Sequence, residues 1–132
     1  MKRIAITFAL LLLAQPAMAS DVIEELLNSY RAEGAAAFDG KRGKTMWQEQ
    51  HQQPQLGKAV SCASCHGTDL TQRGSHIKTG KLIEPLAVRT NAGRLTDPVK
   101  IEKWFGRNCH WTYGRACTAQ EKGDFLLFIQ NY

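Results

Sequence analysis

Residues 62–66 read Cys-Ala-Ser-Cys-His, which places two thiols and an imidazole within one short stretch. Two cysteines separated by two residues are, on their own, compatible with disulfide exchange or zinc binding. The histidine that follows makes the pattern typical of covalent haem c attachment. Each thiol then adds to one vinyl group of the porphyrin, and the imidazole approaches the iron from the proximal side. We therefore expect one haem c, held by Cys62 and Cys65, with His66 as an axial ligand.

The beginning of the chain has the pattern of a secretory signal peptide. Lys2-Arg3 is basic, residues 4–14 are apolar, and Ala17-Met18-Ala19 resembles a cleavage site. The apolar run is shorter than the roughly 20 residues that a membrane-spanning helix needs, so a retained anchor is the less favoured alternative. We expect a signal peptide at 1–19 and a cytochrome domain at 20–132. The mature protein would then lie in the periplasm of a Gram-negative bacterium and would not span the membrane.

Length and charge limit the possible functions further. A chain of 132 residues has room for one domain. The formal net charge of +5 falls to +3 once the two basic residues of the leader are removed, and two haem propionates would cancel most of the rest. No nucleic-acid partner is expected from such a balance. Lys100, Lys103, Arg107 and Arg115 are interpreted as a solvated face, with a docking patch for an acidic redox partner as the alternative.

Hydrophobic spacing predicts an all-α domain without a strand of convincing length. Helices are expected at 21–33, 39–50 and 97–106, with a last helix that begins at Thr118. On the second helix, Gly43 and Trp47 lie one turn apart, so a bulky side chain can pack across the glycine. Gly106 is expected to end the third helix.

Three of these helices also carry recognisable N-terminal signals. Asp21 with Glu24, and Thr118 with Glu121, have the spacing of capping boxes. Asp97 or Thr96 is expected to cap the third helix, with Pro98 in its first turn. Such caps contribute about 1 kcal/mol each, so they adjust stability more than they decide the fold.

Two segments flank the attachment motif. Residues 52–59 contain Pro54 and Gly57 and are expected to form a loop that leads to it. Residues 81–88 are more apolar and are candidate walls of the haem pocket. A backbone carbonyl near Pro85 could accept a hydrogen bond from the Nδ1–H of His66 and fix the ring, with simple packing as the alternative.

The sixth iron ligand is left open by the residues themselves. No methionine follows Cys65, which disfavours the usual Met/His electron carrier. Asn108 and His110 lie about 40 residues beyond the motif, whereas His76 is only ten residues away and is interpreted as a surface-loop histidine. Histidine would bind permanently, whereas asparagine is a weak ligand that a gas molecule could displace. The choice separates an electron carrier from a ligand-binding cytochrome.

Cys109 and Cys117 are the remaining cysteines. Two nearby free thiols are unusual in an oxidising compartment, so we expect a disulfide between them. Such a bridge would close a short loop and contribute about 2–3 kcal/mol to stability. A redox role for the pair is the alternative, and a haem-free module with two disulfides would require Cys62 and Cys65 to pair as well.

The run Thr96–Asp124, with its Arg-Asn-Cys-x7-Cys-Thr-x-x-Glu-Lys pattern, resembles the sphaeroides haem protein family of monohaem cytochromes c. Residues 79–87 and the haem motif are similar to that family too. The resemblance implies a cytochrome c class I-like monohaem domain, a Cys109–Cys117 disulfide, and Asn108 as the distal ligand. Asn108 would bind oxidised iron and leave on reduction, which would allow oxygen, nitric oxide or carbon monoxide to bind.

The resemblance also implies partners for electron transfer, namely a dihaem cytochrome c or a membrane cytochrome b. The expected function is a periplasmic electron-transfer cytochrome with reversible diatomic ligand binding. It is not expected to be an enzyme, apart from a possible minor oxidase-like activity. His110 departs from the small polar residue expected at that position. If His110 bound the iron, the protein would instead be a plain bis-histidine electron shuttle that does not bind gas.

Overall fold

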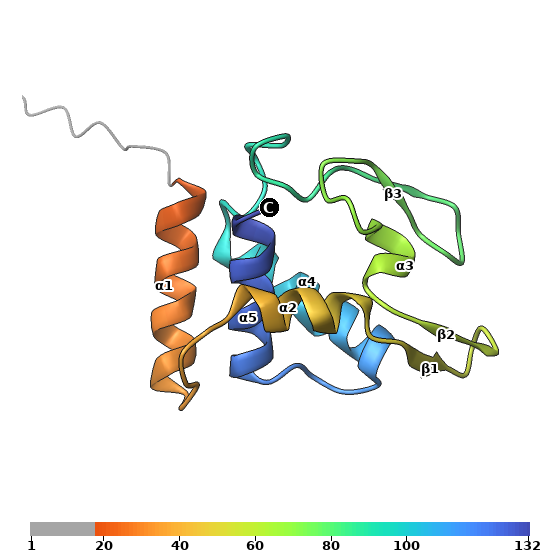
Figure 1. The fold of residues 1–132 in the computed structure, drawn as a ribbon, viewed down its shortest axis with the longest axis horizontal. Coiled ribbons are helices and arrows are strands. Elements are labelled where there is room, and N and C mark those ends of the chain that lie inside the picture. Colours follow the sequence, from red (N-terminus) through yellow and green to blue (C-terminus); the bar gives the residue numbers. More distant parts are fainter. Residues whose placement is uncertain (1–17) are drawn as a thin grey trace, which may run out of the picture.

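The computed structural model describes residues 18–132, which form helices joined by long connections and two short ladders (Figure 1). The helices are α1 (Ala19–Ala32), α2 (Gly40–Gln48), α3 (Ala63–His66), α4 (Pro98–Tyr113) and α5 (Ala119–Gln130). The strands are β1 (His51–Gln53), β2 (Lys58–Val60), β3 (Gly74–Ser75) and β4 (Leu82–Ile83). The domain is therefore all-α in class, as predicted. The expected signal peptide at 1–19 lies outside the described residues except for its last two, and no helix within residues 18–132 is long and apolar enough to cross a membrane.

Helix α1 buries one apolar face, whose residues recur at helical spacing. Its buried side chains pack against Ile101 of α4 and Leu126 of α5, and they are Val22, Ile23, Leu26, Leu27 and Tyr30. The predicted capping box of Asp21 is wrong, because α1 begins at Ala19 and its N-cap has no side-chain hydrogen bond. Asp21 instead lies in the first turn, where its charge is favourable to the helix dipole.

The crossing of α2 and α5 forms the centre of the domain. A Cβ at Gly43 would overlap the backbone of Asp124, with 2.6 Å to its carbonyl carbon and 2.9 Å to Cβ of Phe128. Gly43 therefore admits the α5 backbone itself, rather than the bulky side chain predicted from its spacing to Trp47. The buried Asp124 carboxylate accepts from Arg42 Nε at 2.8 Å and from the Asp39 amide at 2.6 Å. This pairing satisfies the carboxylate at the crossing.

The N-terminal signals of α4 and α5 are confirmed, but the predicted end of α4 is wrong. Asp97 accepts from the Lys100 amide at 3.1 Å, and Thr118 and Glu121 form the expected capping box. Helix α4 passes through Gly106 and ends at Tyr113, with Gly114 as a C-cap that has the left-handed φ of 69°. An interior glycine costs about 1 kcal/mol relative to alanine, and the buried side of α4 continues beyond it. Asn108, Cys109 and His110 are consequently helical.

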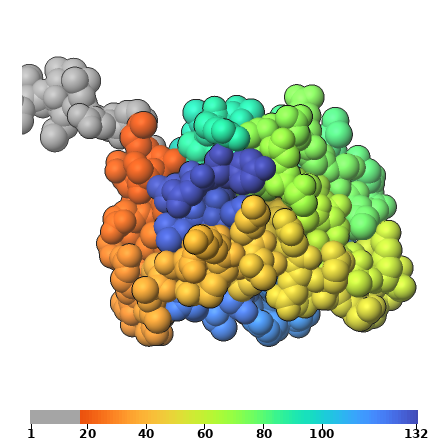
Figure 2. Space-filling model, viewed as in Figure 1, coloured from red at the N-terminus to blue at the C-terminus, as the bar shows by residue number. Residues whose placement is uncertain are grey.

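The short ladders shape the part of the molecule around α3. Strands β1 and β2 form an antiparallel hairpin from residues predicted as a loop, and β3 pairs with β4. Ladders of two or three residues are too short to give a recognisable alternation in sequence. Figures 1 and 2 show the β1–β2 hairpin at the opposite end of the domain from α1, with α2 and α5 between them.

Substituting the two helical glycines tests this packing. Gly43→Ala should lower the free energy of unfolding by about 1–3 kcal/mol, because the added methyl overlaps the α5 backbone. Gly106→Ala should raise it by about 0.5–1 kcal/mol, because nothing lies within 4 Å of the added Cβ. Denaturant unfolding of both variants beside the wild type measures the difference. Equal effects of the two substitutions would contradict the α2–α5 contact.

Candidate haem-binding site

The attachment motif lies on the single turn of α3. Cys62 is its N-cap and His66 its last residue, so Cys62, Cys65 and His66 follow the i, i+3, i+4 spacing that places side chains on one helix face. Cys62 and Cys65 do not pair in a disulfide. The loop that follows packs tightly against this turn, because the Ile77 amide donates to Cys65 Sγ at 3.4 Å. The turn thus presents two sulfurs and one imidazole together.

The His66 imidazole is buried beside α2. Its ring centroid lies 5.4 Å from that of Trp47, whose Nε1–H donates to the Gly67 carbonyl at 2.9 Å. Burial, followed by the nearby Arg94 charge, lowers the pKa of His66 to about 4. The imidazole is therefore neutral near pH 7, which is the form that binds metals. Trp47 of α2 thus holds this turn through an aromatic contact with the His66 ring and a hydrogen bond to the Gly67 carbonyl.

The expected hydrogen bond from His66 to a carbonyl near Pro85 is absent. The Pro85 carbonyl accepts instead from Arg94 Nε at 2.9 Å and from Asn91 Nδ2 at 3.2 Å. His66 Nδ1 is buried without a hydrogen-bond partner among the described residues. The Pro85 carbonyl, which was expected to accept a hydrogen bond from His66, therefore accepts from Arg94 and Asn91 instead.

The residues present fit haem c better than a bare metal ion. Burial raises the pKa of Cys62 to about 12, so its sulfur is a protonated thiol near neutral pH. A structural zinc site needs four ligands. Residues 18–132 contain no group of three or more His, Cys, Asp or Glu side chains that could hold a metal ion. Two thiols and a neutral imidazole on one turn are the donor set that covalent haem requires.

Asn108 and His110 lie on opposite sides of α4. Both are exposed, and two positions along an α-helix correspond to a rotation of about 200°. His110 lines a pocket of about 340 Å³ together with Arg107, Trp111, Gly114 and residues 52–55 around the β1–β2 hairpin. Asn108 is instead three positions before Trp111, whose ring lies 5.7 Å from that of His76.

His76 lies in the loop between β3 and β4, as expected, and is half-buried there. Its Nδ1 accepts from the amides of Lys78 and Thr79, both at 3.3 Å. Ile77, the next residue, is the one that donates to Cys65 Sγ. The loop after the motif therefore connects the Cys65 sulfur with Trp111 on α4.

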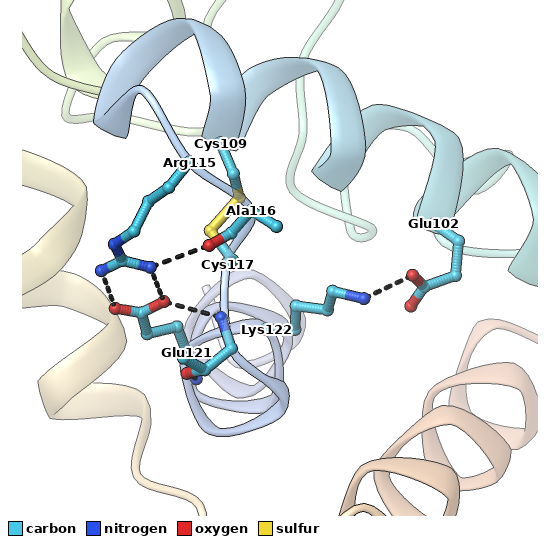
Figure 3. Close-up of a disulfide and its surroundings, with 8 residues drawn as sticks. Glu102, Cys109, Arg115, Ala116, Cys117, Glu121 and Lys122 are labelled. Atoms are coloured by element: carbon cyan, nitrogen blue, oxygen red, sulfur yellow. Dashed lines mark hydrogen bonds and ion pairs between the residues drawn. A yellow bond between two sulfur atoms is a disulfide. The ribbon is translucent and has the colours of Figure 1, made fainter.

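The predicted disulfide is confirmed, with 5.5 Å between the Cα atoms of Cys109 and Cys117 (Figure 3). It joins the last turns of α4 to the start of α5, rather than closing a free loop. Arg115 donates to both Glu121 oxygens, at 2.9 and 2.7 Å, and this pairing lowers the pKa of the Glu121 carboxyl. The bridge and the ion pair together hold the end of α4 that carries Asn108.

Sequence reasoning missed the contributions of Trp47 and Arg94 to this site. Trp47 was expected only to pack, yet it also forms the hydrogen bond beside His66. Arg94 lies in a polar loop, where the sequence carries no local signal that an arginine is partly buried. Its hydrogen bonds to the Pro85 and Glu84 carbonyls form only in the folded chain.

Substituting cysteine pairs separates the two kinds of cysteine. The double variant Cys62→Ala/Cys65→Ala, matured with cytochrome c assembly factors, should lack covalent haem by mass spectrometry. The matched variant Cys109→Ala/Cys117→Ala should keep the haem, with its unfolding free energy reduced by about 2–3 kcal/mol. Haem retained by the first pair, or lost only by the second, would contradict this assignment.

Several known proteins are similar to this chain in sequence and in fold. Residues 33–129 match the family described as "Domain of unknown function (DUF1924)". The chain is 40% identical over 121 residues to the cytochrome c-type protein SHP of Cereibacter sphaeroides, covering 89% of this chain and 90% of that protein. It is 38% identical over 87 residues to cytochrome c'' of Methylophilus methylotrophus, covering 66% of this chain and 60% of that protein.

Solved structures give the same result. A structure of oxidised SHP, described as an oxygen-binding cytochrome c, has a TM-score of 0.75 at 37% identity and covers 83% of this chain and 96% of its own. The crystal structure of oxidised Methylophilus methylotrophus cytochrome c'' has a TM-score of 0.71 at 33% identity, covering 84% and 91%. The chain therefore belongs to this family of c-type cytochromes, whose cofactor is a single covalently bound haem c.

Proposed function

We propose that the protein is an exported electron-transfer cytochrome that binds a diatomic gas reversibly at a labile distal position. In this proposal Cys62 and Cys65 carry the haem, His66 is the proximal ligand and Asn108 the distal one. Haem c supplies an iron that changes between two oxidation states and accepts a small ligand where its coordination is open. The SHP structure described as an oxygen-binding cytochrome c supports the gas-binding part.

The arrangement of α4 is the observation that carries the choice of Asn108. Trp111 packs against His76, and the next loop residue, Ile77, donates its amide to Cys65 Sγ. The side of α4 that bears Trp111 thus faces the segment after the haem motif. Asn108, three positions earlier, shares that side and does not line the pocket beside the β1–β2 hairpin, whereas His110 lines this pocket together with Trp111. This supports an amide, rather than a second imidazole, as the sixth donor.

An amide donor would make the bond between the iron and its sixth ligand weak enough to break reversibly. His66 is held by packing against Trp47 and is neutral by burial, so it remains available in both oxidation states. Asn108 is exposed, with no side-chain hydrogen bond among the described residues, so little holds its amide in place. Axial ligands shift haem potentials across about 0.8 V, so the same choice also determines which donors can reduce the protein.

Location and partners are part of the same proposal. Haem c attachment and the Cys109–Cys117 disulfide both suit an oxidising compartment, which supports the periplasm. A dihaem cytochrome c or a membrane cytochrome b is proposed as the electron-transfer partner. Lys100, Lys103 and Arg107 are exposed on α4 and offer a basic surface for an acidic one.

Two matched substitutions on α4 test the distal ligand. Asn108→Ala should change the absorption and electron paramagnetic resonance spectra of the oxidised protein toward a high-spin form, because the amide donor is lost. His110→Ala should leave both spectra as in the wild type, because that side chain faces away. The reverse result, with His110→Ala alone changing the spectra, would support the bis-histidine shuttle and reject Asn108.

A further inference from the structure

The pocket of about 340 Å³ between the end of α4 and the β1–β2 hairpin lies outside the haem site described above. Helix α4 contributes Arg107, His110 and Trp111 to its wall, and the hairpin contributes residues 52–55. None of the described residues assigned to the haem lines it. Its volume is within the range of sites that hold small molecules.

The wall of this pocket carries positive charge and no acidic side chain. Arg107 is a permanent cation, His110 becomes one when it is protonated, and no aspartate or glutamate of the described chain lines the pocket. Within residues 18–132 Arg107 forms no ion pair, and its guanidinium lies 5.3 Å from the centroid of the Trp104 ring. Stacking on a ring uses the flat face of a guanidinium and leaves its N–H donors free. The pocket therefore favours an anion.

The hydrogen-bond acceptors at this end of α4 are already occupied. The Trp111 carbonyl accepts from Gln53 Nε2, and the His110 carbonyl accepts from the Gly114 amide at 3.0 Å. Gln53 is buried, and its Oε1 accepts from the Gln55 amide at 3.2 Å. These bonds fix the hairpin to α4 and reduce the partial negative charge that a helix C-terminus presents to an anion. The walls are thus held before a ligand binds, and mainly N–H donors remain for it.

We propose that this pocket binds a small carboxylate with an apolar body, and that Arg107 is its charge partner. A guanidinium forms a forked pair of hydrogen bonds with a carboxylate. Trp111 and Pro54 provide apolar surface for the rest of the molecule. A free organic acid and an acidic side chain of a partner protein both offer this chemistry.

The site borders the turn of α4 that carries Asn108. Arg107 directly precedes Asn108, and the Trp111 ring, one turn later, lies 5.7 Å from that of His76. A bound carboxylate would therefore restrain the turn that has to release the iron. That effect on gas binding rests on the proposed function, whereas binding of the carboxylate does not depend on which residue is the distal ligand.

Calorimetric titration of the haem-containing protein with benzoate tests the binding. The protein is reduced and saturated with carbon monoxide, so that benzoate does not bind the iron, and ionic strength is held constant with chloride. We expect saturable binding at one site that Arg107→Gln weakens by about tenfold or more, because a charge-assisted pair is lost. Lys103→Gln is the matched control, because it removes one exposed charge from the same helix outside the pocket, and should change the affinity little.

A blocked peptide with a single glutamate, titrated in the same way, distinguishes the two sources of the carboxylate. Tighter binding of benzoate favours a free organic acid, and tighter binding of the peptide favours a partner protein, provided that Arg107→Gln weakens it. Absence of saturable binding by both probes would overturn the proposal. Equal weakening by Arg107→Gln and Lys103→Gln would also overturn it, because general attraction to a basic surface would then explain the result.

NMR of the wild type locates the site without any substitution. In nitrogen-15 spectra of the same reduced protein, the probe that binds should shift the amide signals of residues 52–55 and 107–114 most. Shifts centred on another part of the surface would contradict the proposal. A protein that is low-spin when reduced, and that carbon monoxide leaves unchanged, would reject the labile distal ligand while leaving this measurement possible.

Discussion

The close contact of α2 with α5 is the constraint on which the haem site depends. Gly43 lets the two helices approach at backbone distance, and the buried Asp124 carboxylate, paired with Arg42, is satisfied at the same crossing. One turn beyond Gly43, this packing directs Trp47 toward α3. There its ring contacts the His66 imidazole and its Nε1–H binds the Gly67 carbonyl. The orientation of His66, the proposed proximal ligand, is therefore set by helix packing as well as by the motif itself.

A second constraint acts on the two candidate distal ligands. Because α4 continues through Gly106, Asn108 and His110 belong to a rigid helix, and only one of them can face the segment after the haem motif. The Cys109–Cys117 bridge and the Arg115–Glu121 pair anchor this end of α4 to α5. With Asn108 as the proposed distal ligand, its amide could leave the iron while α4 stays folded, which would suit reversible binding of a gas.

Many features of the fold and of the site could be predicted from the sequence, and the features that could not depend on tertiary contacts. The buried face of α1, the caps at Asp97 and Thr118, and the Cys109–Cys117 pair all follow from local spacing or from the chemistry of the compartment. The continuation of α4 past Gly106 depends on tertiary packing, which outweighs an unfavourable local propensity. The bonds of Arg94 to the Pro85 and Glu84 carbonyls depend on a chain reversal that no local pattern encodes.

The absorption spectrum of the reduced protein, recorded before and after addition of carbon monoxide, tests the central claim most directly. A weak amide above the iron predicts a high-spin reduced form whose Soret band shifts within the mixing time as the gas binds. A reduced spectrum that is already six-coordinate and low-spin, and that carbon monoxide leaves unchanged, would show a strong sixth ligand and contradict the account.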